Sequence, residues 1–313
     1  MGMPIMTAPQ SGGPRRHVKL SYGNEPIMMS ELPRTPFGNT NISRLVSGGN
    51  PLVGNSHLSP ELSREMAEYF TTEEAVKYLH RLAEHGIETF QARGDYRVLQ
   101  WLELLKRQGG RLQFIAQTAS EMHDVFENIR VLAAAGAIGI YHHGTQTDNW
   151  WLQGEVEKVK DYLKCMRDQG VQVGLGTHIP EVIEYAEEKG WDVDFYMAAL
   201  YNISRRPRES AVVSGRHNHG EQYPDEDPPR MCETIRATEK TCLAFKVLAA
   251  GRRCRTQEDV RAALTFAYAN IKPKDAVVVG MFDKHLNQIA LNVEHVLVAL
   301  RSQASETSAR AAG

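Results

Sequence analysis

Short apolar runs alternate with amphipathic segments along most of the chain, and this alternation predicts strands and helices in turn. The runs are rich in β-branched residues and apolar throughout, as expected of parallel strands that are covered on both faces. The predicted strands span residues 42–48, 86–92, 112–117, 137–143, 171–178, 193–201, 242–248 and 276–281.

The segments between these runs carry the signals that begin and end helices. Segment 71–86 begins with a threonine cap and ends on Gly86, and segment 120–136 begins at Ser120 and ends on Gly136. A hydroxyl side chain accepts a free backbone N–H at a helix start, and glycine adopts the left-handed conformation at a helix end. Segments 180–190 and 256–270 carry similar start and end signals, and helices that alternate with the strands predict repeated βα units.

Eight such units predict an α/β fold, a closed (β/α)8 TIM barrel. An open doubly wound sheet is the alternative, but no Gly-x-Gly-x-x-Gly motif follows the first predicted strand. We expect an N-terminal arm over 1–40, the barrel over 41–302 and a flexible tail over 303–313. The long connections 50–70, after strand one, and 202–230, after strand six, should border the active face at the C-terminal ends of the strands.

Charge and composition exclude several classes of function. The chain has 36 basic and 38 acidic residues, a net charge of -2, so no basic field would collect nucleic acid or an anionic membrane. No apolar run reaches the roughly 20 residues that span a bilayer. The N-terminus lacks a secretory pattern and the four cysteines lack CxxC spacing, which favours a cytoplasmic protein. We expect a small-molecule substrate as the partner and leave a homo-oligomer open.

Polar side chains at the strand ends predict an active site. A single polar residue there is explained by packing, but a buried lysine or imidazole is costly without a partner, and the set exceeds what packing needs. We assign acid-base roles to the histidines and the lysine and substrate contacts to the glutamines. The set is Gln91, Gln117, the adjacent His142 and His143, His178, and Lys246.

Two alternatives stay open at this site. Either His142 or His143 faces the barrel, since adjacent strand residues point to opposite faces. Lys246 is either chemical or a structural brace paired with Glu88 or Asp194 on other strands.

The long connection 202–230 is predicted to contribute to binding. Arg205, Arg206 and Arg208 could grip an anionic or polyhydroxylated substrate. The nearby His217 and His219, followed by Glu221, could contact substrate or converge on a transition metal. A solvated charged loop is the alternative interpretation.

Several segments, taken together in their order and spacing, resemble one enzyme family. They are ISRLVSGGNPLVG, HGIETFQARGDY, IGIYHHGTQTD, GVQVGLGTHIPEVIEYAEEKGWDVDFYMAALYN and VVVGMFDKHLNQIALNVE. Residues 42 to about 300 resemble the aldo/keto reductases. The resemblance implies a (β/α)8 barrel that binds NADPH at its C-terminal face without a Rossmann motif. It also implies a catalytic set of Asp, Tyr, Lys and His, with the tyrosine as general acid.

The chain departs from this catalytic set. The resemblance places Tyr96 at the tyrosine position and His143 at the histidine position. Gln91 stands where the family has aspartate, and Gln117 stands where it has lysine. Without that lysine, Tyr96 would be a weaker acid-base group at neutral pH.

The cofactor positions depart as well. Gly176 and Ala198 stand where the family holds the nicotinamide amide, and Gln288 stands at an arginine position for the 2′-phosphate. Lys246 replaces a serine that supports the pyrophosphate, and Lys284 could substitute for the lost arginine. These departures weigh against hydride transfer.

We therefore predict an enzyme of the aldo/keto reductase fold that acts on a small sugar- or keto-type substrate. Its catalytic residues would be His143, Lys246 and His178, with Tyr96 nearby. A metal-assisted lyase or isomerase reaction is favoured, with a divalent metal held by His57, His143 and His178. The alternatives are a divergent NADPH-dependent reductase and a non-catalytic barrel that binds a metabolite.

Overall fold

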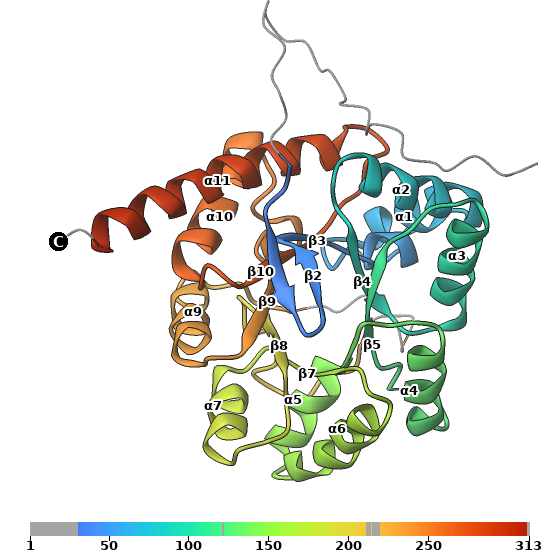
Figure 1. Cartoon of the computed structure of the whole chain (residues 1–313), viewed down its shortest axis with the longest axis vertical. Helices are drawn as coiled ribbons and strands as arrows, with labels where there is room; N and C mark the ends of the chain where they lie inside the picture. The colour runs from blue at the N-terminus through green and yellow to red at the C-terminus, as the bar shows by residue number, and fades with distance from the viewer. Residues whose placement is uncertain (1–30, 121, 211–213, 215–219, 312–313) are drawn as a thin grey trace, which may run out of the picture. The chain divides into compact units, whose positions relative to one another are not determined.

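The computed structural model describes residues 31–120, 122–210, 214 and 220–311, and Leu32–Gly313 form one compact unit. Eight parallel strands close into a barrel that is surrounded by helices (Figure 1). The predicted (β/α)8 barrel is confirmed. Around it the strands are Leu45–Gly48 (β3), Thr89–Arg93 (β4), Gln113–Gln117 (β5), Gly139–His142 (β6), Gln172–Thr177 (β7), Phe195–Ala199 (β8), Thr241–Phe245 (β9) and Ala276–Gly280 (β10).

Helices follow the strands, and the predicted threonine caps Thr71 and Thr256 are present. The helix predicted to begin at Ser120 begins instead at Val125 with Asp124 as its cap, and Ser120 Oγ lies 2.8 Å from Nδ1 of His143. The α-helices are Pro60–Tyr69 (α1), Thr72–Glu84 (α2), Tyr96–Arg107 (α3), Val125–Ala134 (α4), Gly144–Leu152 (α5), Val159–Asp168 (α6), Pro180–Glu188 (α7), Asp227–Ala237 (α9), Gln257–Asn270 (α10) and Gln288–Ala311 (α11). Short 3-10 helices span Pro51–Val53 (η1), Val156–Lys158 (η2) and Ala249–Gly251 (η3). Helix α1 lies within the connection predicted over 50–70, and α11 continues through the segment predicted as a flexible tail.

A hairpin that the sequence pattern does not reveal closes one end of the barrel. Strands Arg34–Phe37 (β1) and Thr40–Ser43 (β2) pair antiparallel across the predicted boundary between arm and barrel. Figure 1 shows this hairpin over the centre of the barrel. The Phe37 ring packs 4.9 Å from the Phe195 ring and belongs to the barrel core. Residues 1–30 of the predicted arm lie outside the described residues.

The barrel interior is apolar and tightly filled. Val46, Ile115 and Leu243 come from three different strands and are completely buried in the core around Phe37. At Gly174 the space is already taken, since a Cβ there would lie 2.3 Å from the Phe195 ring. The core therefore fills the barrel from the hairpin end, and polar side chains gather at the opposite end, where the strands finish.

No helix in the described part of the chain is long and apolar enough to cross a membrane.

Candidate functional site

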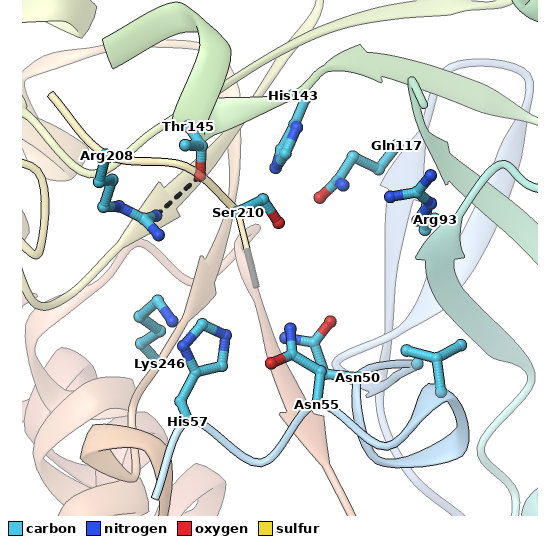
Figure 2. A pocket seen from close by; sticks show the side chains of 12 residues that line it. Asn50, Asn55, His57, Arg93, Gln117, His143, Thr145, Arg208, Ser210 and Lys246 are labelled. Carbon is cyan, nitrogen blue, oxygen red and sulfur yellow. Dashed lines mark hydrogen bonds between the residues drawn. The ribbon is translucent and has the colours of Figure 1, made fainter. Parts of the chain in front are cut away.

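Three adjoining cavities lie at the C-terminal ends of the barrel strands. The central cavity measures about 50 Å³ and is lined by side chains that Figure 2 shows pointing toward one another, including His57, Arg93, His143, Arg208 and Lys246. An apolar cavity of about 360 Å³ adjoins it and shares His57 and Lys246 with it. A polar cavity of about 300 Å³ lies on its other side and shares His143 and Arg208 with it.

His143 faces the central cavity, and His142 does not. The side chain of His142 points toward the helices, where its ring lies 5.3 Å from the Trp150 ring and 5.2 Å from the Tyr162 ring. Its Nδ1 lies 2.8 Å from Thr147 Oγ1. The open choice between the two histidines is thus resolved in favour of His143, which is the residue at the turn from β6 into α5.

The His143 ring is held in its orientation by hydrogen bonds to two neighbouring hydroxyl side chains. Its Nδ1 lies 2.8 Å from Ser120 Oγ, and its backbone N–H donates to Thr118 Oγ1 at 3.0 Å. Burial lowers the pKa of His143 well below its usual value, and the neighbouring His142 adds to this shift. The imidazole is therefore neutral at neutral pH and can exchange a proton with a ligand.

His178 forms a buried pair with a residue that the sequence analysis did not single out. Its Nδ1 lies 2.7 Å from a carboxylate oxygen of Asp148 on α5, and Thr177 Oγ1 donates to the same carboxylate at 2.5 Å. Burial lowers the pKa of His178 to about 4, against the opposing effect of Asp148. A neutral His178 must carry its proton on Nδ1 to donate to the carboxylate. Nε2 then has the free lone pair and is the basic atom.

A second histidine–carboxylate pair connects two loops above the cavity. Nδ1 of His57, after η1, lies 3.2 Å from both carboxylate oxygens of Glu221, in the loop after β8. Tyr223 also donates to Glu221 at 2.7 Å. Burial lowers the pKa of His57 to about 4, and Lys246 acts in the same direction. Neutral His57 therefore also presents Nε2 as a base.

Lys246 lies where the central and apolar cavities meet. It follows β9 directly, and Figure 2 shows its side chain beside His57. Burial lowers the pKa of Lys246 to about 8, opposed by Glu221 and assisted by the guanidinium groups of Arg208 and Arg252. Within the described residues, no hydrogen bond or ion pair joins its ammonium to another side chain.

The structural-brace alternative for Lys246 therefore lacks its partners. Glu88 pairs with Arg34, and Asp194 pairs with Arg167 at 2.8 Å. The carboxylate whose charge acts on Lys246 is Glu221, from the long loop.

Backbone strain is concentrated in the same loops. Among the described residues, a positive φ outside glycine occurs at His57 (56°), Lys246 (58°), Ala249 (47°) and Ala250 (52°). A residue with a Cβ is disfavoured in this region, and such residues persist where the surrounding structure enforces them, often at functional sites. His57 and Lys246, which line both the central and the apolar cavity, are thus both held in strained backbone.

Arg208 is fixed over the central cavity by hydrogen bonds to both its backbone and its side chain. The Asn149 side chain donates to the Arg208 carbonyl at 2.7 Å and accepts from its N–H at 3.0 Å. The guanidinium donates to Thr145 Oγ1 at 2.8 Å and to Ser204 Oγ at 3.3 Å. One guanidinium nitrogen lies 3.6 Å from Glu221, so a rigid cation reaches the cavity from the long loop.

The two predicted glutamines are connected through a tyrosine inside the barrel. Gln91 donates to the Tyr141 hydroxyl at 2.7 Å, and that hydroxyl donates to Gln117 at 3.0 Å. Gln117 lines the central cavity and Gln91 lines the apolar cavity. Burial raises the pKa of Tyr141 well above its usual value, so this polar network is uncharged.

Several predicted site residues lie elsewhere. Tyr96 begins α3, is 69% exposed and lines none of the three cavities, so it is not placed to act as the acid of this site. Arg205 is paired with Asp227 at 2.6 Å, and Arg206 is exposed, so neither reaches the cavities. Of the three predicted arginines, Arg208 lines the central cavity. His217 and His219 lie outside the described residues.

Arg93 is a cavity residue that the sequence analysis missed. It ends β4 two positions after Gln91 and lines the central cavity. Its Nε lies 3.4 Å from Asp95. Two-residue spacing from Gln91 places both side chains on one face of the strand, which is the signal that could have identified it.

The predicted metal ligands come together only in part. His57 and His143 both line the central cavity, but His178 does not. Among the described residues, no group of three or more His, Cys, Asp or Glu side chains could hold a metal ion. The three-histidine ligand set is thus not formed, and whether a divalent metal takes part stays a prediction.

Comparisons with known proteins identify no family for the chain. No family model and no curated protein matches the chain, so the resemblance to the aldo/keto reductases stays a prediction. Solved structures that are similar include a truncated 3-deoxy-D-arabino-heptulosonate 7-phosphate synthase from Thermotoga maritima, with 12% identity, a TM-score of 0.48 and coverage of 89% of this chain and 93% of that one.

A dihydropteroate synthase from Xanthomonas albilineans is 17% identical with a TM-score of 0.45, covering 88% of this chain and 98% of that one. A putative deoxyribose-phosphate aldolase from Coccidioides immitis is 11% identical with a TM-score of 0.43, covering 73% and 79%. At these identities nothing about the reaction transfers to this chain.

Proposed function

We propose that the chain is a lyase- or isomerase-type enzyme that acts on a small, anionic, oxygenated substrate through an imine with Lys246. The observation that carries the proposal is the Lys246 side chain, which reaches the central cavity without an ion-pair partner among the described residues. With a pKa of about 8, part of this amine is neutral at neutral pH and can attack a carbonyl carbon.

The charge around the cavity supports an anionic substrate. Arg93, Arg208 and Lys246 all line the central cavity, whereas the nearest carboxylate, Glu221, already accepts hydrogen bonds from His57 and Tyr223. Guanidinium groups bind carboxylates and phosphates through paired N–H donors. An anion would therefore relieve the mutual repulsion of the cations at the cavity wall.

The proposed reaction begins with attack of the neutral Lys246 amine on a substrate ketone. A bond forms between Nζ and the carbonyl carbon, the carbonyl oxygen leaves as water with the two amine protons, and protonation gives an iminium ion. Loss of a proton or a bonded carbon group from the adjacent carbon then sends an electron pair toward the iminium nitrogen. His143 and His57, both neutral and both lining the cavity, are positioned to take and return that proton.

Reductive trapping tests this proposal. Sodium borohydride with a small oxo acid such as pyruvate should attach the reduced ligand to Lys246, as mapped by peptide mass spectrometry. Lys246→Met should abolish the attachment, and Lys284→Met, at an exposed lysine that pairs with Glu65, should retain it. Attachment that persists in Lys246→Met, or none with any of a panel of oxo acids, would refute the imine.

A divergent NADPH-dependent reductase is the second candidate. Lys246 and Gln288, which the resemblance assigns to the cofactor site, both line the apolar cavity. Enhancement of NADPH fluorescence on mixing would favour it. A non-catalytic barrel that binds a metabolite predicts neither trapping nor any effect of His143→Ala on turnover.

A further inference from the structure

The apolar cavity is large enough to bind part of a ligand, and the central cavity is not large enough to hold a whole one. At about 50 Å³ the central cavity accommodates one small polar group. The apolar cavity, at about 360 Å³, is more spacious and is continuous with it through His57 and Lys246. A ligand that contacts Lys246 must therefore extend into a neighbouring cavity.

The walls of the apolar cavity favour a hydrocarbon group. Its lining includes Leu62 and Met66 on α1, Leu248 after β9 and Phe282 after β10. Among its described lining residues, Lys246 and His57 at the junction are the only basic side chains, and none is acidic. Burying an apolar substituent here is favourable in proportion to its area, whereas an anion would find no cationic side chain beyond the junction.

The central cavity has the opposite preference. Arg93 and Arg208 line it but do not line the apolar cavity. Arg208 is held by Asn149 and Thr145, so its guanidinium is fixed before a ligand arrives. A cation that is already held in place binds a carboxylate at a smaller ordering cost.

We infer that the substrate is a 2-oxo acid with an apolar side chain, R–CO–COO⁻. Its carboxylate lies in the central cavity beside Arg93 and Arg208, and R lies in the apolar cavity. The carbonyl carbon then falls between the two cavities, next to Lys246. This inference rests on the proposed function, because it assigns a substrate class to the same lysine.

The order of groups in the ligand follows from the order of cavities in the protein. Lys246 carries the amine at the junction, where the cationic cavity and the apolar cavity share lining residues. In a 2-oxo acid the ketone carbon is bonded directly to the carboxylate on one side and to R on the other. Imine formation joins Nζ to that carbon and releases its oxygen as water, and the C3 proton becomes the one that His143 or His57 removes.

A chain-length series tests the inference. With borohydride, 4-methyl-2-oxopentanoate should be trapped on Lys246 at a half-saturating concentration at least about tenfold below that of pyruvate. The uncharged 4-methylpentan-2-one should be trapped poorly, because it lacks the carboxylate. Equal half-saturation for pyruvate and 4-methyl-2-oxopentanoate would overturn the inference while leaving the imine established.

A substitution in the apolar cavity tests whether the substituent R of the ligand lies there. Leu62→Trp should fill part of the apolar cavity and reduce the preference for 4-methyl-2-oxopentanoate over pyruvate by about tenfold. Val298→Trp is the matched control at an exposed position of α11 and should keep the preference of the wild type. A preference unaffected by Leu62→Trp would place R outside the apolar cavity and overturn the assignment.

A binding measurement separates the two proposals. The acid 4-methylpentanoate lacks the ketone and cannot form an imine, yet it carries the same carboxylate and side chain. Calorimetric titration of the wild type should show it binding at least about tenfold more tightly than propanoate. If this difference appears without any trapping, the two cavities are assigned correctly and the imine is wrong. If 4-methylpentanoate binds no better than propanoate, the subsite assignment is wrong whether or not an imine forms.

Discussion

The carboxylate of Asp148 lies 2.7 Å from Nδ1 of His178, and the two residues, 30 positions apart, meet because α5 packs against β7. Asp148 is completely buried and also accepts from the Thr177 hydroxyl. Removing one partner of a buried pair leaves the other without compensation. This pair therefore contributes to both the stability of the barrel and the orientation of His178.

Asp148→Ala should lower the free energy of unfolding by about 3–5 kcal/mol, because His178 and Thr177 lose their shared acceptor. Urea unfolding measures this change. Asp168→Ala is the control, since Asp168 forms only an exposed pair with Lys164 and should cost less than about 1 kcal/mol. A similar cost in both variants would contradict the importance of the buried pair.

Trapping of an oxo acid on Lys246 should follow the ionisation of its amine. The neutral form is the nucleophile, and the pKa of Lys246 is lowered to about 8 from its usual 10.5. The trapping rate should therefore rise with pH and reach half its maximum near pH 8, as measured between pH 6 and 10. A midpoint close to pH 10.5 would show that the cavity does not lower the pKa of Lys246.

Stability should fall in mild acid because of the buried histidines. The pKa values of His57 and His178 in the folded chain are lowered to about 4 from 6.5, so the unfolded chain binds more protons between these values. Stability that is present above pH 6.5 is thus lost as pH falls toward 4, by on the order of 3 kcal/mol for each histidine.

Urea unfolding of wild type and His178→Gln between pH 4.5 and 7.5 measures this loss. The variant should show a shallower decline, because one of the depressed groups is absent. Parallel declines in the two proteins would exclude His178 as a source of the acid sensitivity.

Asn149→Ala should weaken ligand binding without changing the chemistry. The Asn149 side chain makes two hydrogen bonds to the Arg208 backbone and contributes no group that titrates. Its loss should raise the half-saturating concentration of an oxo acid by about tenfold and leave the pH midpoint of trapping near 8. Asn270→Ala, at an exposed helix end, should change neither quantity. A shifted midpoint in Asn149→Ala would mean that Arg208 acts mainly through the pKa of Lys246.

NADPH should bind weakly, with a dissociation constant above about 100 μM. Lys284, the residue that could replace the lost arginine contact, is paired with Glu65 at 2.8 Å. Isothermal titration measures the affinity. Binding in the low micromolar range would restore the reductase as the leading interpretation.

The alternation of apolar runs and helical segments was sufficient to predict the barrel, because the strands are largely buried and four of the segments between them carry start or stop signals. The hairpin β1–β2 was not foreseen, since each strand is short and contains or adjoins Pro36, Gly38 or polar residues. Its packing on the barrel depends on Phe37 meeting Phe195, a contact between distant segments.

The sequence predicted part of the arrangement of side chains around the central cavity. His143 and Lys246 both line it, as expected because polar residues at strand ends converge at one end of a barrel. Asp148 could not be found, since its role depends on where α5 packs after β6. Glu221 was noted only beside two histidines, and its pairing with His57 depends on two loops meeting in space. Tyr96 was assigned from the family resemblance alone, and in the structure its side chain is exposed outside the cavities.

The hydrogen bonds from Gln91 through Tyr141 to Gln117 bear on how the site of this protein can change in evolution. These three side chains satisfy one another without a formal charge, so the barrel beneath the site folds the same way whichever ion the loops above attract. Arg208 and Glu221 lie in the connection between β8 and α9, outside the strands, so we expect that a mutation there can alter ligand preference without disturbing strand packing. Loop exchange on this scaffold is thus a practical route to new specificities.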